Sequence, residues 1–397
     1  MASRASPSPY LLAGNGLAAF LTFTHVFNDA FQAMLPALLP TLQIRFALSE
    51  ASLALLVAVL AFSSSVMQPV FGALADRFGR RMVGSLGVIA CTMLLSLLGT
   101  APTPLVLVGL LLLGGFGSAA FHPSSTSLVG SAAKGRRELA TSIFIFGGGI
   151  GQALGPIAVL LVIANYGLQY MPWLMIPGLV MGGLMYLLVP PQPRLPRGAR
   201  PRLFDPGLFL GPVGALCAAG ILRTIAWVTF INAMPLWLVT SHGVGRDATL
   251  IGLTIGLFTF SGGLGGMLAS TLAVRVGRKR LITATMLLAL PALYLVLLLP
   301  PGSLLYFLAI MLAGGLTNAA LPLMVVSAQD LAPQAVATAS GMLMGLTWGT
   351  AGVLYIFVGL LQEAIGIGPA MRVGYLFLIP AALLALLVLS RQQRRAT

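Results

Sequence analysis

The chain alternates between long apolar runs and short breaks that are polar, charged or rich in Gly and Pro. A helix needs about 20 apolar residues to cross a hydrocarbon core about 30 Å thick, and each run is long enough for one crossing. The pattern predicts twelve membrane-spanning helices. Their ranges are 12–40, 51–73, 82–100, 105–129, 139–163 and 172–189, followed by 208–240, 249–273, 281–299, 304–326, 336–361 and 373–389.

The composition supports this interpretation. Of the 397 residues 58% are hydrophobic and 8% are charged, which leaves too little polar surface for a soluble globule. Twelve spans and their loops use nearly the whole chain, and the sequence has no HExxH motif, nucleotide-binding loop or pair of acidic residues. Cys91 and Cys217 lie far apart in apolar runs. We therefore expect no enzyme, no cofactor and no metal site.

The basic residues predict the orientation in the membrane. With an even number of spans and both termini in the cytoplasm, 18 of the 22 Lys and Arg residues fall on the cytoplasmic side. Arg45, Arg246 and Arg372 fall outside. This asymmetry is what the positive-inside rule describes. The net charge of +14 then reflects topology, and we expect a lipid bilayer around the protein and no nucleic-acid partner.

The chain is predicted to be a duplicated unit. Residues 190–206 carry six prolines and four arginines, which is typical of a linker. At a shift of 198, residues 74–81 align with 272–279, and at a shift of 199, residues 114–123 align with 313–322. We expect a bundle at 1–189, a cytoplasmic linker at 190–207 and a bundle at 208–397. Because each half has six spans, both enter the membrane with the same orientation, around a central cavity.

The predicted loop between the second and third spans carries a known motif. Residues 72–81 read GALADRFGRR, which resembles the GxxxDRxGRR signature of the major facilitator superfamily. The resemblance implies an all-α transporter with a cytoplasmic gate, in which Asp76 and Arg77 help to latch the gate. A short loop with a locally paired Asp is the alternative. The motif positions are Gly72, Asp76, Arg77, Gly79, Arg80 and Arg81.

The fifth span carries a stripe of small residues. Gly147, Gly151 and Gly155 recur every four residues and end at Pro156, so they let another helix approach closely. The segment Gly151–Pro156 resembles the GxxxGP signature of proton-coupled drug exporters in the superfamily. Plain helix packing is at least as good an explanation, because the spacing recurs in the eleventh span at Gly341, Gly345 and Gly349.

A narrower resemblance involves the first and fourth spans. His25, Asn28–Asp29 and Leu35–Pro36 in the first, and residues 121–123 (Phe-His-Pro) in the fourth, look like the fosmidomycin-resistance branch of the superfamily. The resemblance implies a secondary antiporter for small drug-like or anionic compounds. We expect it to export them in exchange for protons in the bacterial inner membrane, and we take a monomer as the default. An importer or facilitator of a metabolite such as an organic anion is the alternative with the same fold, and a membrane-embedded enzyme or a receptor without transport is the alternative of another class.

Two charges lie deep in the predicted spans, Asp29 and Arg223. A charge at the centre of a bilayer costs about 2.5–3.5 kcal/mol on insertion scales, so each needs a structural or functional reason. His25, Asn28, Asp29 and Gln32 follow i, i+3, i+4, i+7 spacing, which places them on one helix face. We expect Asp29, with His25 as relay, to carry the coupled proton.

Arg223 aligns with His25 at the repeat shift of 198. We therefore expect Asp29 and Arg223 to face each other across the cavity, pairing in one state and separating in another, while an anionic substrate competes with Asp29 for Arg223. A fixed structural pair is the alternative. For His122, a hydrogen-bonded core histidine is an equal alternative, and for Trp227 plain packing is. The substrate-binding candidates are Asn28, Gln32, His122, Gln152, Arg223, Trp227 and Asn318.

Overall fold

The computed structural model describes residues 14–132, 137–191, 206–332 and 341–396, together with Leu12 and Ala339. These residues form helices and turns, without a strand. Each predicted span of the first half corresponds to a helical stretch. The stretches are α1 (Gly14–Gln32) with α2 (Met34–Phe46); α3 (Glu50–Ala61), η1 (Phe62–Val66) and α4 (Gln68–Phe78); α5 (Arg80–Ser96) with η2 (Leu98–Thr100); α6 (Pro104–Ala132); α7 (Arg137–Tyr166); and η3 (Leu168–Leu174) with α8 (Met175–Leu188).

The second half repeats this organisation. Its stretches are α9 (Pro206–Leu210) with α10 (Pro212–His242); α11 (Thr249–Val276); α12 (Arg278–Val296); α13 (Leu304–Leu331); η4 (Met342–Leu346) with α15 (Thr347–Ile365); and α16 (Ile367–Leu376) with α17 (Leu378–Ala396). Within the described ranges, eleven stretches are long and apolar enough to cross a membrane. The α1–α2 stretch is the twelfth crossing, and it is less apolar because α1 carries His25, Asn28, Asp29 and Gln32.

The first span extends further than the sequence indicates. It was expected to end at residue 40, but α2 continues through Pro40 to Phe46. The helix continues because Leu38, Leu39 and Leu42 are fully buried, and burial of these side chains outweighs the hydrogen bond that the proline removes. Arg45 closes the end of α2 by donating to backbone carbonyls of the loop after α5. The expected linker lies mostly outside the described residues, so its boundaries stay a prediction.

The backbone confirms the internal repeat. Gly79, between α4 and α5, has φ +104°, and Gly277, 198 residues later between α11 and α12, has φ +89°. Gly167 and Gly366, 199 residues apart, have φ +97° and +86°. L-residues with side chains rarely adopt this region, so glycine is required at each of these turns. The two halves therefore use the same turns at the same places.

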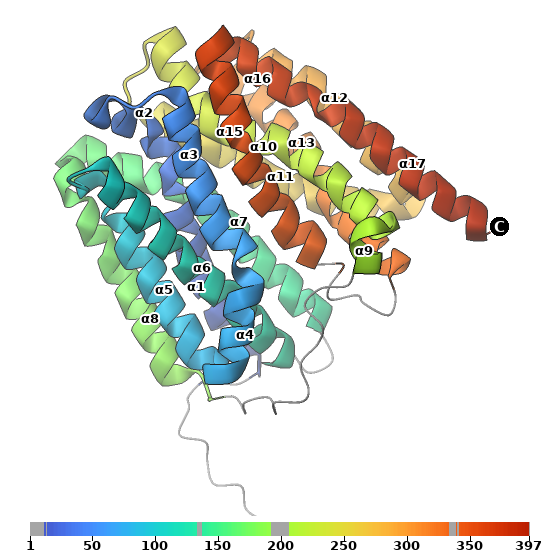
Figure 1. Cartoon of the computed structure of the whole chain (residues 1–397), viewed down its shortest axis with the longest axis horizontal. Helices are drawn as coiled ribbons and strands as arrows, with labels where there is room; N and C mark the ends of the chain where they lie inside the picture. The colour runs from blue at the N-terminus through green and yellow to red at the C-terminus, as the bar shows by residue number, and fades with distance from the viewer. Residues whose placement is uncertain are drawn as a thin grey trace, which may run out of the picture.

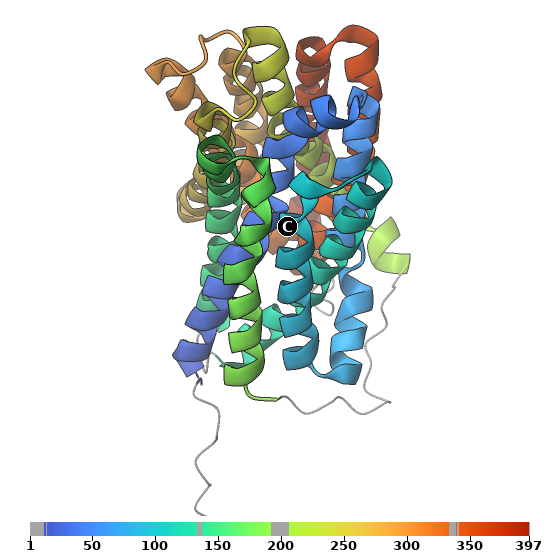
Figure 2. The ribbon, with the colours of Figure 1, turned by 90° about the vertical axis from the view of Figure 1, so that its left-hand side faces the viewer.

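The two halves form two bundles that lie side by side (Figure 1). The N-terminal bundle runs from blue to green and the C-terminal bundle from yellow to red, and Figure 2 shows the N-terminal bundle from its own side. The turn between α4 and α5, directly before Arg80 and Arg81, lies on the lower side of Figure 1. We call this the basic side, and the positive-inside rule makes it the cytoplasmic side.

The bundles contact each other on the side away from the basic loops. Gly359 and Gly352 of α15 lie directly against Ala54 and Ala61 of α3. Glu363, near the end of α15, accepts a hydrogen bond at 3.0 Å from the backbone N–H of Ala51 at the start of α3. A second contact joins α7 to α11, where Gly252 and Gly256 lie against the 153–157 segment. These contacts close the structure on its outer side.

Toward the basic side, the segment that leads into α15 no longer packs against the N-terminal bundle. A side chain at Gly349 would collide with Val66, one at Gly345 would lie 3.9 Å from Gln68, and one at Gly341 would meet nothing within 4 Å. The expected packing stripe in the eleventh span therefore packs only at its outer end. We conclude that the described structure is closed outside and separated toward the cytoplasm.

Substitution of Gly359 tests this outer closure. Gly359→Leu is expected to weaken the closed state by about 1–3 kcal/mol, because the new side chain has no room beside Ala54. One to two kcal/mol changes a two-state population about 5- to 30-fold. The readout is the rate at which a membrane-impermeant maleimide labels Ala58→Cys from outside, with Cys91 and Cys217 replaced by Ala. Gly183→Leu, at a site with no neighbour within 4 Å, is the control, and equal rates in both variants would contradict the assignment.

Candidate functional site

A buried carboxylate lies at the centre of a polar cluster in the N-terminal bundle. Asp29 is 4% exposed. Its Oδ1 accepts from the amide of Asn28 at 3.0 Å and from that of Gln32 at 3.4 Å, and its Oδ2 accepts from the amide of Gln152 on α7 at 3.1 Å. The polar face predicted for the first helix therefore points inward, toward α6 and α7, and gathers three of the expected substrate-binding residues around Asp29.

Two imidazoles complete the cluster. His25 Nε2 lies 3.4 Å and His122 Nε2 lies 3.2 Å from Asp29 Oδ1. The two Nε2 atoms are themselves 3.2 Å apart. His122 comes from α6, one residue before Pro123, and the sequence left its place in the cavity open. We call His25, Asp29 and His122 the triad.

Backbone carbonyls determine where the imidazole hydrogens lie. His25 Nδ1 is 2.7 Å from the carbonyl oxygen of Phe144, and His122 Nδ1 is 2.9 Å from that of Ser118. A carbonyl oxygen only accepts, so we assign the hydrogen of both rings to Nδ1; in His122 the hydroxyl of Ser118, 3.1 Å from the same Nδ1, is the competing partner. In a neutral ring the Nε2 atom then carries a lone pair. With this assignment, the three atoms that face one another are all electron-rich, an arrangement that a cation among them would stabilise.

The hydrogen bonds around Asp29 favour its charged carboxylate. Three amide N–H groups donate to the Asp29 carboxylate, and hydrogen bonds to the charged form favour that form. The expectation that Asp29 carries the coupled proton with His25 as relay stays a prediction. The side chain of His122 is 21% exposed, whereas those of His25 and Asp29 are 6% exposed. His122 is therefore the member of the triad with access to solvent.

Three positions around the triad were not predicted from the sequence. The hydroxyl of Ser118 accepts from Asn28 at 3.0 Å and from Gln32 at 2.6 Å. Phe144 contributes only its backbone carbonyl, which no side-chain pattern reveals. A Cβ on Gly148 would lie 2.5 Å from Cε1 of His25 and 2.8 Å from Oδ2 of Asp29. Ser118 lies four residues before His122 and therefore on the same helix face, and this spacing is the sequence feature that could have indicated Ser118.

A buried cation occupies the corresponding place in the C-terminal bundle. Arg223 is fully buried on α10. It donates at 3.0 Å to the carbonyl of Thr317, the side chain of Asn318 and the hydroxyl of Thr224, while its Nε has no partner. Every partner is neutral, and among the described residues no carboxylate contacts this guanidinium. Arg223 therefore keeps an uncompensated charge.

The structure does not join Asp29 to Arg223. No hydrogen bond or ion pair links the two described side chains, and each is bound within its own bundle. A fixed structural pair is thereby absent from this conformation, and so is the direct competition expected for Arg223. The reason is local. Asp29 already lies against two imidazoles of its own bundle, and Arg223 already donates to Thr317 and Asn318 of α13.

Trp227 lies in a separate aromatic cluster. Its ring centroid is 4.5 Å from that of Phe258 and 5.9 Å from that of Trp348, and the side chain is 2% exposed. These contacts match the packing alternative more closely than ligand contact. Asn318 also donates to the carbonyl of Gly262 at 3.3 Å, so it joins Arg223 to α11.

The gating motif lies at the cytoplasmic ends of α4 and α5. Gly72 faces the ring of Pro123 at van der Waals distance, and the two residues line a small pocket together with Arg80. Arg81 lies over the ring of Tyr186 on α8 at 4.8 Å, and Arg77 lies over the ring of the adjacent residue 78. The side chain of Asp76 is outside the described residues, so the latch stays a prediction.

The glycine stripe of the fifth span packs against α1. Side chains at Gly147, Gly151 and Gly155 would collide with the backbone or side chains at Thr22, Val26 and Ala30, respectively. These three partners are spaced four residues apart on α1. The stripe therefore brings α7 close enough for Gln152 to reach Asp29, while the carbonyl of Pro156 lies beside α11.

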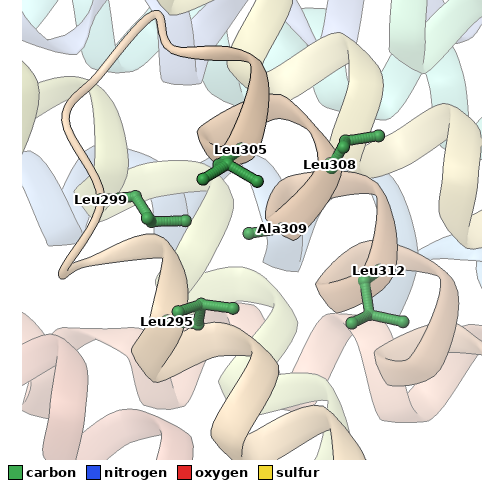
Figure 3. Close-up of a pocket in the computed structure, with 6 residues that line it drawn as sticks. All are labelled: Leu295, Leu299, Leu305, Leu308, Ala309 and Leu312. Carbon is green, nitrogen blue, oxygen red and sulfur yellow. The ribbon is translucent and has the colours of Figure 1, made fainter.

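An apolar hollow between α12 and α13 lies apart from these polar groups (Figure 3). No polar side chain lines it, so it offers no recognition of charge. Its lining residues are Leu295, Leu299, Leu305, Leu308, Ala309 and Leu312.

Twin six-helix bundles with buried polar groups in each half define a membrane transporter. The family model of the Major Facilitator Superfamily matches residues 21–354, so the chain belongs to this superfamily. It is a multi-pass transporter of small molecules and not an enzyme.

The comparisons also confirm the resemblance to the fosmidomycin-resistance branch. The chain is 25% identical over 364 residues to the fosmidomycin resistance protein of Escherichia coli (strain K12), covering 88% of this chain and 86% of that protein. It is 28% identical over 382 residues to the uncharacterized MFS-type transporter YfnC of Bacillus subtilis (strain 168), with 94% and 92% covered.

A solved structure shows the same fold. A bacterial homolog of the human lysosomal transporter Spinster, in an inward-facing and occupied conformation, superposes with a TM-score of 0.78. The identity is 18%, and the match covers 97% of this chain and 98% of the other.

Two neighbouring glycines test the crowding around the triad. Gly148→Ala is expected to displace His25 and Asp29 and to lower the free energy of unfolding by about 1–3 kcal/mol, because its Cβ has no room. Gly149→Ala, whose Cβ would meet nothing within 4 Å, should be neutral or slightly stabilising, since Ala is the better helix former. Thermal unfolding in detergent and transport in vesicles are compared. Equal behaviour of the two variants would contradict the described packing.

Proposed function

We propose that the protein is a proton-driven exporter of small drug-like or anionic compounds in a bacterial inner membrane, working as a monomer by alternating access. The observation that carries this proposal is the triad, a buried site for one cation with a single solvent-reaching member. The name of the fosmidomycin resistance protein supports drug export, and the separation of the bundles on the basic side supports entry of cargo from the cytoplasm.

The triad supports the proton as the coupled ion. One proton shared between the Nε2 atoms and Asp29 makes the cluster neutral, whereas its loss leaves a buried negative charge. A buried uncompensated charge is costly, so proton uptake and release change the energy of closing the bundles around the cluster. His122 gives the proton its path to solvent, and His25 and Asp29 hold it.

Arg223 supports an anionic or hydrogen-bond-accepting cargo. Its guanidinium keeps a free Nε donor and has only neutral partners. A phosphonate or carboxylate is the complementary group, because guanidinium binds such anions through paired hydrogen bonds. We propose that Asn28, Gln32, Gln152 and Asn318 bind further polar groups of the cargo.

The contacts of the cargo determine the sign of coupling. A cargo that also binds the triad through its own donor group displaces the proton, and exchange results. An anion that binds to Arg223 alone instead binds more tightly when the triad holds a proton, since the proton neutralises the negative charge of the triad. The uncompensated charge of Arg223 thus favours a second candidate function, proton-coupled uptake of an organic anion.

Asp29→Asn tests the proton site. In proteoliposomes with a pH gradient, wild-type protein should move fosmidomycin against its gradient while protons move the other way. Asn keeps the shape of Asp29 but cannot hold a proton between the imidazoles, so coupled proton movement should fall to that of protein-free vesicles. Asp247→Asn, an exposed acid, is the control. If Asp29→Asn still moved protons with cargo, the site assignment would be wrong, and cargo accumulation in the direction of the proton flow would establish the uptake function.

Arg223→Gln tests the anion site. Hydrogen bonds to charged groups contribute about 1.5–3 kcal/mol, so the Kd for fosmidomycin, measured by calorimetry, should rise about 10- to 100-fold. A neutral ester of the same drug should bind equally to both proteins. The exposed Arg246 gives the control Arg246→Gln, and loss of affinity in that variant, or for the ester, would argue against Arg223 as the anion receptor.

A further inference from the structure

We propose that the triad is also a binding site for a divalent transition-metal ion of the Zn²⁺ class, which takes the place of the proton. This inference goes beyond the proposed transport function and does not depend on any cargo. It concerns what else His25, Asp29 and His122 can hold in the geometry that the structure gives them.

The spacing of the three donor atoms is that of a tetrahedral zinc site. The Nε2–Nε2 distance is 3.2 Å, and the two Nε2–Oδ1 distances are 3.4 and 3.2 Å. Zinc binds imidazole nitrogen and carboxylate oxygen at about 2.0–2.2 Å, and a tetrahedron with such bonds has edges of about 3.3–3.5 Å. The ligand atoms therefore lie within a few tenths of an ångström of the required positions without a metal among them.

The surroundings orient the donor atoms as a metal site requires. Histidines that bind metals through Nε2 almost always donate Nδ1–H to a carbonyl or carboxylate. His25 does so to the carbonyl of Phe144 and His122 to that of Ser118. The free oxygen of the carboxylate, Oδ2, is held by Gln152 at 3.1 Å. These contacts fix both ring tautomers and the carboxylate, so little entropy remains to be lost when an ion binds.

The donor set selects the class of ion. Two imidazoles and one carboxylate suit Zn²⁺, Co²⁺ and Ni²⁺, whereas Mg²⁺ and Ca²⁺ prefer sites made of oxygen ligands. The triad supplies three ligands, which leaves a fourth position for water or an anionic oxygen. The partly exposed side chain of His122 marks the side from which the ion and the fourth ligand arrive.

A Co²⁺ titration tests this site directly. Protein purified through a tag without histidine, and freed of metal with a chelator, is titrated with Co²⁺, because tetrahedral Co²⁺ absorbs visible light far more strongly than octahedral Co²⁺. One equivalent should bind with a tetrahedral spectrum. An excess of Zn²⁺ should abolish this spectrum, and an excess of Mg²⁺ should leave it unchanged.

Variants of two histidines and of Asp29 assign the signal. Loss of an outer-shell partner costs a metal site about 10- to 100-fold in affinity, so His122→Gln, which removes a ligand, should weaken Co²⁺ binding by more than about 10-fold. His242 is exposed and lies beside Trp237 at the end of α10, so His242→Gln should bind like wild type. Asp29→Asn is the second ligand variant, and thermal unfolding identifies any variant that fails to fold.

Several outcomes would overturn the proposal. They are the absence of stoichiometric Co²⁺, an octahedral spectrum, or equal affinity in wild type and in a folded His122→Gln or Asp29→Asn protein. The titration uses no gradient and no cargo, so its failure leaves proton-coupled transport by the metal-free protein untouched. Conversely, a transport assay that shows no coupling would refute the proposed function while the metal site stands.

Discussion

Three electron-rich atoms that converge inside a membrane need a positive charge among them. This constraint governs the N-terminal bundle, where Asp29 Oδ1 and the Nε2 atoms of His25 and His122 lie 3.2–3.4 Å from one another. Water cannot easily compensate such a group at this depth, and burial of an uncompensated charge is costly. The helices around it are arranged accordingly. The glycines of α7 bring Gln152 to the carboxylate, and α6 brings Ser118 and His122.

The C-terminal bundle solves a related problem with the opposite charge. In each half, the first membrane crossing places an ionisable side chain against the fourth crossing of the same half. His25 meets His122 in one half, and Arg223 meets Thr317 and Asn318 in the other. The duplicated architecture therefore produces two equivalent polar sites, one built around a carboxylate with two imidazoles and one built around a guanidinium. Transport requires the occupancy of these sites to change the energy of closing the bundles.

Much of the fold followed from the sequence, because membrane thickness fixes the length of each span and the repeat shift of 198–199 fixes the relation of the halves. The same shift predicted that Arg223 and His25 occupy equivalent positions, and helical spacing predicted the shared face of His25, Asn28, Asp29 and Gln32. The end of the first span was wrong, since Pro40 reads as a stop in the sequence while the burial of Leu42 is a tertiary effect.

The remainder of the site depends on contacts that no single helix encodes. The position of His122 against Asp29 depends on how α6 packs beside α1, and the carbonyls that fix the imidazole hydrogens belong to the backbone. Helical spacing also cannot show whether Asp29 bonds to Arg223 or to imidazoles, because both were reachable across a cavity of unknown shape.

The central claim is that both imidazoles of the triad donate through Nδ1 and turn Nε2 toward Asp29. The chain has three histidines, so ¹⁵N solid-state NMR of the histidine-labelled protein in bilayers can distinguish them, with His242→Gln removing the exposed one. We predict that His25 and His122 both show a protonated Nδ1, and that at least one of them is an imidazolium when the triad holds its proton. Neutral rings with a bare Nδ1 and a protonated Nε2 would contradict the account.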